Sequence, residues 1–254
     1  MALFSDGGIS TVADLTAQDS SLLEVAATEG IDLTQKLTLA QGELGLELEA
    51  SLERMRSTYN PLWGQLQFTV ANVTVTPSLQ VWHAYRTLAA VYRDAYFSQL
   101  NARYAAKWQL FEKLARKTML DTLEVGVGMV ADPVPQAGAP QLSTVAGVGT
   151  GGIFYAAVAF LNAAGEEGLA STVTNLTVAP LSLLVIAAGT APANATGWNA
   201  YAGTDPSALA LLNATPLPIR SSFTWVPGVV GGRGPTRGQT PNVLRVIPRM
   251  WQRG

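Results

Sequence analysis

The sequence of 254 residues contains no cysteine and a single histidine, His83. The absence of thiols excludes disulfide bonds, thiol nucleophiles and thiolate metal sites. One imidazole leaves only carboxylates as further metal ligands, and the spaced acids of a calcium-binding loop do not occur. No Gly-x-Ser-x-Gly motif accompanies His83. We therefore predict no catalytic residue, cofactor site or metal site, and we expect His83 to be a structural histidine.

Charge and long apolar segments are also scarce. Only 13% of the residues are charged, the net charge is −2, and the mean hydropathy is positive. Contact with other subunits is one way in which a protein accommodates so few charges. No apolar run reaches the roughly 18 residues of a membrane-spanning helix, and the N-terminus lacks the basic and apolar regions of a signal peptide. We expect a protein that is made in the cytoplasm and has no membrane partner.

The charges that are present are segregated along the chain. Residues 1–53 contain ten acidic residues and one basic residue, and residues 54–117 contain nine basic residues and two acidic residues. Residues 220–254 contain six arginines and no acidic residue. Such blocks can be solvated faces, and they also suit head-to-tail contacts in which the acidic surface of one subunit meets the basic surface of the next.

The longest regular pattern runs from Thr76 to about Glu124 and predicts one long amphipathic helix. Thr76 suits the capping position and Pro77 suits the first helical position. A helix of some 45 residues would reach roughly 65–70 Å, about twice what a compact domain needs. The length favours the spine of an assembly subunit, with the core helix of an ordinary bundle as the alternative. The apolar face recurs every three or four residues at Trp82, Tyr85, Leu88, Tyr92, Tyr96, Leu100, Tyr104, Trp108, Phe111, Ala115 and Met119.

The other faces of this predicted helix are basic. The aromatic residues share one face and the basic residues lie on others, so they do not form a stacking platform for sequence-specific nucleic-acid binding. Nonspecific contact with DNA, or contact between subunits, is the role that this pattern allows. The candidate residues for this channel-facing or intersubunit face are Arg86, Arg93, Arg103, Lys107 and Lys113.

Two shorter helices are predicted before the spine. Residues 16–29 form the first, and Gly30 ends it. Asp32 and Gln35 suggest a capping box for the second, and Asn60-Pro61 ends it. Residues 62–75 suggest an extended or partly stranded connector. The acidic second helix is expected to lie antiparallel to the spine, with ion pairs between them. The apolar residues of the second helix are Leu33, Leu37, Leu39 or Ala40, Leu44, Leu48 and Leu52.

Composition changes after the spine, and the expected organisation is α+β and multidomain. We predict a helical bundle over residues 1–130, a linker over 131–140, an all-β domain over 141–230 and an extended C-terminal arm over 231–254. Short runs rich in Val, Ala and Thr, separated by turn residues, are typical of a β-sandwich. The predicted strands are residues 153–161, 171–178, 183–187, 198–202, 209–214 and 222–226.

The predicted arm has no hydrophobic period, because glycine and proline recur throughout it. It nevertheless carries Met250 and Trp251 close to its end, which a disordered tail rarely does. We expect the arm to become ordered against a neighbouring subunit or another protein, with Trp251 as an anchor, and a frayed terminus is the alternative. The candidate docking residues are Arg245, Ile247, Arg249, Met250 and Trp251.

Two segments of the predicted β-domain resemble fibronectin type III-like, and more broadly immunoglobulin-like, modules. Residues 154–168 with Ser171 resemble the late strand pair of that module, in which an aromatic-led strand ends in Asn and a Gly-Glu turn. Residues 194–203, around Trp198, resemble the strand that usually precedes it. The order is reversed here, so the resemblance implies either a circularly permuted sandwich or a more distant immunoglobulin-like relative.

The whole arrangement resembles the head-to-tail adaptor proteins, also called connector or neck proteins, of tailed bacteriophages. The resemblance is strongest over Thr76–Lys117, in Trp82-His83-Ala84-Tyr85-Arg86 and Tyr92-Arg93-Asp94-Ala95-Tyr96-Phe97. It implies a homo-oligomeric ring, typically of twelve copies, in the neck of the virion between capsid and tail. Such a ring binds the portal protein, extends the DNA channel and connects to the tail or the next neck protein.

Two other functions remain open. A carbohydrate- or receptor-binding module of a virion surface or tail would show exposed aromatic residues in the β-domain besides Trp198 and Trp225, which are expected in the core. An enzyme is the weakest alternative, because it would depend on His83.

Overall fold

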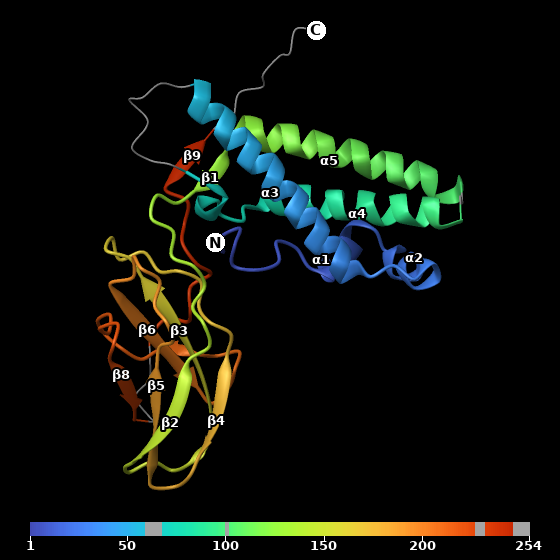
Figure 1. The fold of residues 1–254 in the computed structure, drawn as a ribbon. Helices are drawn as coiled ribbons and strands as arrows, with labels where there is room; N and C mark the ends of the chain where they lie inside the picture. The colour runs from blue at the N-terminus through green and yellow to red at the C-terminus, as the bar shows by residue number, and fades with distance from the viewer. Residues whose placement is uncertain (59–67, 100–101, 227–231, 246–254) are drawn as a thin grey trace. The chain divides into compact units, whose positions relative to one another are not determined.

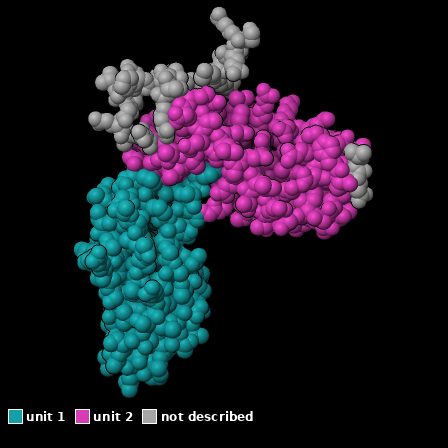
Figure 2. All heavy atoms as spheres, viewed as in Figure 1, with its two compact units in different colours: residues 1–6, 132–240 teal, residues 7–131, 241–254 magenta. Residues whose placement is uncertain are grey.

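The computed structural model describes residues 1–58, 68–99, 102–226 and 232–245, and it divides into two compact units. Residues 7–131 and 241–254 form a helical unit, and residues 1–6 and 132–240 form a sheet unit (Figure 2). The protein is therefore mixed α+β, with an N-terminal helical region followed by antiparallel sheets (Figure 1). The predicted linker and domain boundaries differ from this division, because residues 1–6 and 132–140 belong to the sheet unit.

The helical unit contains five α-helices among its described residues. Two short 3-10 helices, Val70–Asn72 and Ala102–Tyr104, accompany them, and β1 (Val127–Met129) pairs with β9 (Val243–Arg245). The helices are α1 (Val12–Gln18), α2 (Leu22–Glu29), α3 (Leu33–Thr58), α4 (Pro77–Gln99) and α5 (Ala105–Val125).

The prediction of one long helix from Thr76 to Glu124 is wrong. The segment forms two helices, α4 and α5, which lie side by side (Figure 1). The stripe of aromatic residues folds back on itself, so that Tyr92 stacks on Phe111 at 5.6 Å and Tyr96 stacks on Trp108 at 5.7 Å between ring centroids. A three-to-four residue period is satisfied equally by a straight helix and by a hairpin whose halves bury each other. Each helix is only about 35 Å long, so length no longer argues for an assembly role.

Most of the predicted helix ends are confirmed. Gly30 adopts a left-handed conformation at the end of α2, the Asp32 carboxylate accepts hydrogen bonds from the backbone of Thr34 and Gln35, and α4 begins at Pro77. The single helix predicted over residues 16–29 is wrong, because α1 and α2 are separated at Asp19. Asp19 instead accepts hydrogen bonds from the backbone and hydroxyl of Ser21.

The core of the helical unit lies where α1, α2 and α5 pack on α4. Its largest fully buried side chains include Tyr92, Leu88 and Leu15. On α3 the buried apolar side chains are Ala40, Leu44, Leu48 and Leu52, which decides between Leu39 and Ala40 in favour of Ala40. Residues 62–67 of the predicted connector lie outside the described residues, and Val73 forms an isolated bridge with Met129.

The sheet unit consists of two antiparallel sheets. The strand order is β2-β5-β8 in one sheet and β4-β3-β6-β7 in the other. The strands predicted around 153–161, 183–187, 198–202 and 222–226 are confirmed. Those predicted over 171–178 and 209–214 are confirmed only over 174–178 and 210–211, and β2 was not predicted. The bounds are β2 (Gln141–Ala146), β3 (Gly152–Leu161), β4 (Thr174–Val178), β5 (Ser182–Ala187), β6 (Gly197–Gly203), β7 (Ala210–Leu211) and β8 (Ser222–Trp225).

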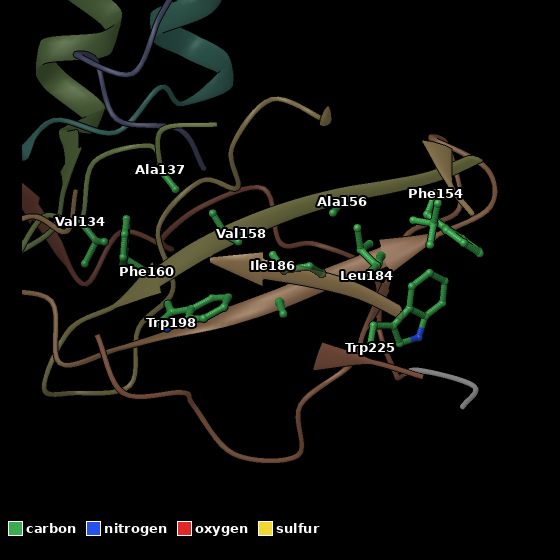
Figure 3. Close-up of a cluster of buried hydrophobic side chains, with 13 residues drawn as sticks. Val134, Ala137, Phe154, Ala156, Val158, Phe160, Leu184, Ile186, Trp198 and Trp225 are labelled. Carbon is green, nitrogen blue, oxygen red and sulfur yellow. The ribbon is translucent and has the colours of Figure 1, made fainter. Parts of the chain in front are cut away.

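Both sheets contribute to one hydrophobic core (Figure 3). Trp198 of β6 is fully buried, and the ring of Phe154 on β3 meets Trp225 of β8 edge-on at 5.0 Å between centroids. Val134 and Ala137, which lie in the predicted linker, are buried in the same cluster. The segment before β2 is therefore part of the folded unit.

Candidate interaction surfaces of the helical unit

Arg86, the first residue of the predicted basic face, is bound within the helical unit. Its guanidinium lies 2.6 Å from Glu43 and 3.5 Å from Glu47 of α3, and 3.9 Å from Glu112 of α5. One cation therefore connects three helices. These contacts confirm the expected ion pairs between the acidic helix and the segment that follows Thr76, although Lys36 of α3 pairs with Asp94 of α4 in the opposite sense.

Lys107 on α5 is also bound internally. Its ammonium group donates hydrogen bonds to Asp19 at 2.7 Å, to the Ser21 hydroxyl at 2.6 Å and to the Tyr92 hydroxyl at 3.1 Å. Burial alone would raise the pKa of the Asp19 carboxyl, but the hydrogen bonds from Lys107, Tyr92 and Ser21 outweigh it and lower the pKa to about 2. This network ties α5 to the short segment between α1 and α2.

Arg103 is more exposed but also has a partner. Its guanidinium lies over the Tyr104 ring at 4.5 Å and within 3.5 Å of Glu29. Hydrogen bonds from Ser98 and Tyr104 to the Glu29 carboxylate lower its pKa. Three of the five predicted basic residues are therefore held by acidic residues of the same unit.

Arg93 and Lys113 behave differently. Both side chains are exposed, and neither forms an ion pair in the part of the chain that the structure describes. Arg116, which was not among the predicted site residues, is exposed on α5 as well. The basic surface available to a partner is thus smaller than the sequence suggests, and it is concentrated on the outer side of α5.

Exposed leucines accompany these charges. Leu39 and Leu46 on α3 are 52% and 74% exposed, and Leu110 on α5 is 51% exposed. Phe97 near the end of α4 is 57% exposed and packs its edge on Tyr96. In the sequence, Leu46 falls outside the spacing of the predicted apolar face of α3, whereas Leu39 is one of the two alternatives for that face.

His83 is buried and bonded at both ring nitrogens. Ser10 Oγ lies 2.5 Å from Nδ1, and the Leu37 carbonyl oxygen lies 3.0 Å from Nε2. A carbonyl can only accept, so Nε2 carries the proton and Nδ1 accepts from the Ser10 hydroxyl. Burial lowers the pKa of His83, which keeps the ring neutral. The expected structural histidine agrees with this geometry.

The part of the predicted docking arm that forms β9 is folded onto the helical unit. Arg245 belongs to β9, opposite Val127 of β1, and its guanidinium lies 4.3 Å from the centroid of the Phe68 ring. A side chain at Gly128 would come within 3.0 Å of Thr74, Thr76 and Pro241, so glycine is required for this close approach. The other candidate arm residues, Ile247, Arg249, Met250 and Trp251, lie outside the described residues.

The residues before β9 are held by the sheet unit. Arg233 pairs with Glu167 at 2.5 Å, and the Tyr201 hydroxyl donates a hydrogen bond to the same carboxylate. Burial and the neighbouring Glu167 carboxylate raise the pKa of Tyr201 above its usual range. The Gln239 side chain is buried and bonds to the backbone of Val134 and Asp132. Residues 232–240 are therefore part of the folded sheet unit.

Within the described ranges, the structure contains no group of three or more side chains placed to hold a metal ion. None of the helices in those ranges is long and apolar enough to cross a membrane. Comparison of the chain with protein-family models, with curated proteins and with solved structures found no match.

Proposed function

We propose that this protein is a structural virion protein, a head-to-tail adaptor that forms a ring in the neck of a tailed bacteriophage. The observation that carries the proposal is the combination of exposed leucines with segregated charge on the helical unit. Exposed Leu39 and Leu46 lie on the acidic helix α3, and exposed Leu110 lies beside Lys113 and Arg116 on α5. Apolar anchors bordered by charge of one sign are typical of surfaces that bind other subunits.

The partners of this ring follow from the sequence resemblance. They are further copies of the chain, typically twelve in all, the portal protein, and the tail or the next neck protein. Arg93, Lys113 and Arg116 are the cations left for nonspecific contact with DNA in the channel, since Arg86, Arg103 and Lys107 are bound to acidic residues of the same unit. The arm that follows β9 would carry Ile247, Arg249, Met250 and Trp251 to the portal or to a neighbouring subunit.

We also propose that the sheet unit is an immunoglobulin-like sandwich that decorates or braces the ring. Two antiparallel sheets of three and four strands around a buried Trp198 support this assignment. The pair β3–β4 precedes β6–β7 along the chain, which is the reversed order noted in the sequence and favours a circular permutation. No aromatic side chain is among the exposed large apolar residues described in this unit, so no observation favours a carbohydrate-binding function.

The first test is native mass spectrometry of the full chain, alone and mixed with the portal protein of the phage that encodes it. We expect a ring-sized assembly, or several copies bound to each portal. A monomer that ignores the portal at all concentrations would overturn the proposal, and a monomer that binds glycans would replace it with the receptor-binding function.

The arm is tested by removing residues 246–254. A cut at this point keeps β9 and its pairing with β1, and it keeps Gln239 and Arg233 of the sheet unit. We expect weaker binding to the portal or between copies, with unchanged melting of both units. Unchanged assembly would reject the arm as a docking element.

A further inference from the structure

The outer side of α3 carries a stripe of residues that no part of the described chain explains. Leu39, Gly42, Leu46 and Ala50 follow each other at intervals of three and four residues, and all four are exposed. Leu46 is 74% exposed. A stripe at this spacing lies along one side of a helix. The stripe on the other side of α3, formed by Ala40, Leu44, Leu48 and Leu52, is buried inside the unit.

Gly42 is the most informative residue of this stripe. It lies inside a helix of 26 residues, and a side-chain carbon added there would meet nothing within 4 Å. Glycine in a helix interior is less stable than alanine, and no neighbour among the described residues requires glycine at this position. The missing side chain leaves a hollow between Leu39 and Leu46, which allows another helix to approach closely.

The outer side of α5 offers a matching knob. Leu110 is 51% exposed, and Lys113, Arg116 and Lys117 follow it on exposed positions within two turns. Lys117 pairs with Asp121 of the same helix, and Lys113 forms no ion pair within the described ranges. Residues 110–117 of α5 therefore present one exposed apolar side chain, Leu110, next to more basic than acidic side chains.

The same stretch of α3 carries the opposite charge. Between residues 39 and 50, α3 carries the acids Glu43, Glu47 and Glu49 and no basic residue. Arg86 contacts the first two of these acids and leaves a surplus of negative charge. If Leu110 of one helix lies at Gly42 of the other and the helices run parallel, Lys117 falls opposite Glu49. Crossing helices remain in contact for about two turns on either side of the crossing point, which includes this pair.

We propose that the outer stripe of α3, residues 39–50, is the binding site for the outer side of α5, residues 110–117, of a second copy of this chain. The charges select this pairing, because α3 against α3 would oppose acids and α5 against α5 would oppose bases. The contact joins two different surfaces, so it repeats from copy to copy and builds a ring or a filament. The inference rests on the proposed ring and names the surfaces that form it.

Arg86 connects the two helices, α3 and α5, that carry the proposed binding surfaces. It contacts α3 through Glu43 and Glu47 and α5 through Glu112. The two surfaces are thereby held at a fixed angle within one helical unit, and a repeating contact between rigid surfaces closes into a ring when its rotation permits.

Charge exchange tests the proposal in the full chain. Glu49→Lys alone, and Lys113→Glu with Lys117→Glu, should each weaken self-association at least tenfold in sedimentation equilibrium. The triple variant that combines them should recover association to within about threefold of the parent protein, because the charges are exchanged but remain opposite. Glu24→Lys on α2 and Arg220→Glu in the sheet unit are matched controls, since both side chains are exposed and belong to neither stripe, and both changes should leave association unchanged.

Gly42 supplies a second, steric test. Gly42→Trp should fill the hollow and reduce association at least tenfold while the circular dichroism and melting of the chain remain those of a folded protein. Gly42→Ala should raise the melting temperature, because alanine favours the helix and meets no neighbour.

The outcomes separate this inference from the proposed function. Parent protein that stays monomeric with and without portal overturns both. Parent protein that assembles normally while Gly42→Trp and the charge reversals have no effect keeps the ring and overturns this contact. Reversals that weaken association without recovery in the triple variant also overturn the pairing of α3 with α5.

Discussion

The helical unit and the sheet unit use polar side chains in different ways. In the helical unit, ion pairs join helices that are distant in sequence, as Arg86 and Glu43 do. In the sheet unit, none of the seven strands β2–β8 contains a charged residue. Asparagines hold that unit locally instead: Asn162 accepts hydrogen bonds from the backbone of Ala164 and Glu166, and Asn213 bonds to the backbone of Ala200. Charged recognition is therefore expected of the helical unit.

The largest expected effect is a loss of the sheet core. Trp198→Ala removes a fully buried ring whose Nε1 donates to the Pro218 carbonyl at 2.9 Å. We expect the free energy of unfolding of the sheet unit to fall by about 3–5 kcal/mol. Hydrogen exchange measured segment by segment should show faster exchange in β3 and β6 and unchanged exchange in α4 and α5. Equal acceleration in both units would mean that they unfold as one cooperative body.

The corresponding change in the helical unit is Phe111→Ala. This ring stacks on Tyr92 at 5.6 Å and on Tyr85 at 6.2 Å, and it is 5% exposed. We expect a loss of about 3 kcal/mol, measured by urea denaturation and seen as faster exchange in α4 and α5. Phe97→Ala is the matched control, because that ring is 57% exposed and should cost much less. Equal effects of the two changes would contradict the aromatic hairpin.

The next effect depends on pH and tests the network that Asp19 forms with Lys107 in the helical unit. The Asp19 pKa is lowered from 3.8 to about 2, so its charged form contributes on the order of 2 kcal/mol, reduced by the exposure of Lys107. A lowered folded-state pKa gives stability that is present above the unfolded-state pKa and is lost as pH falls through the folded-state value. Asp19→Asn should therefore destabilise the helical unit at pH 6.

That difference between parent and variant should shrink as the pH falls from about 4 to 2, and it should leave the sheet unit unaffected. Thermal melting across this range measures it, with Glu24→Gln on α2 as the exposed control. A difference that stays constant down to pH 2 would show that the ion pair does not hold α5 to the segment between α1 and α2.

The smallest effect is a gain. Gly42→Ala should stabilise the helical unit by up to about 1 kcal/mol, because the new side chain meets open space on an exposed helix position. Gly168→Ala in the sheet unit is the contrasting change, since its side chain would lie 2.6 Å from the Val134 carbonyl oxygen and should destabilise that unit. Chemical denaturation of each variant should show a higher free energy of unfolding for Gly42→Ala and a lower one for Gly168→Ala.

The two units also differ in how far the sequence predicted them. The strands β3, β5, β6 and β8 were predicted because their buried side chains form short runs between turn residues. β2 was missed because only Leu142 in it packs against the core, so the strand carries no alternating pattern. β1 and β9 were missed because each has three residues, lies among glycines and prolines, and finds its partner more than 100 residues away.

In the helical unit, the sequence predicted most helix ends but not how the helices pack on one another. The helix ends follow from Gly30, Asp32 and Pro77, whose effects are local. The fold-back of α5 on α4 leaves the period of the apolar stripe unchanged, so periodicity could not reveal it. The basic residues were identified, but the acids that bind three of them lie in helices far away in sequence, and only the folded structure separates Lys113 from Lys107.

The pairing of β1 with β9 means that the segment between these strands can be replaced by a short turn. Met129 lies opposite Val243, so the two ends of the segment 130–242 leave and re-enter the helical unit on adjacent antiparallel strands. Neighbouring residues of such a pair are only about 5 Å apart, a gap that a two-residue turn bridges. The segment is thus an insertion at the tip of what would otherwise be an ordinary hairpin. Replacing it with Asn-Gly should leave the helical unit with a continuous, closed backbone, and only residues 1–6 would lose the unit to which they belong.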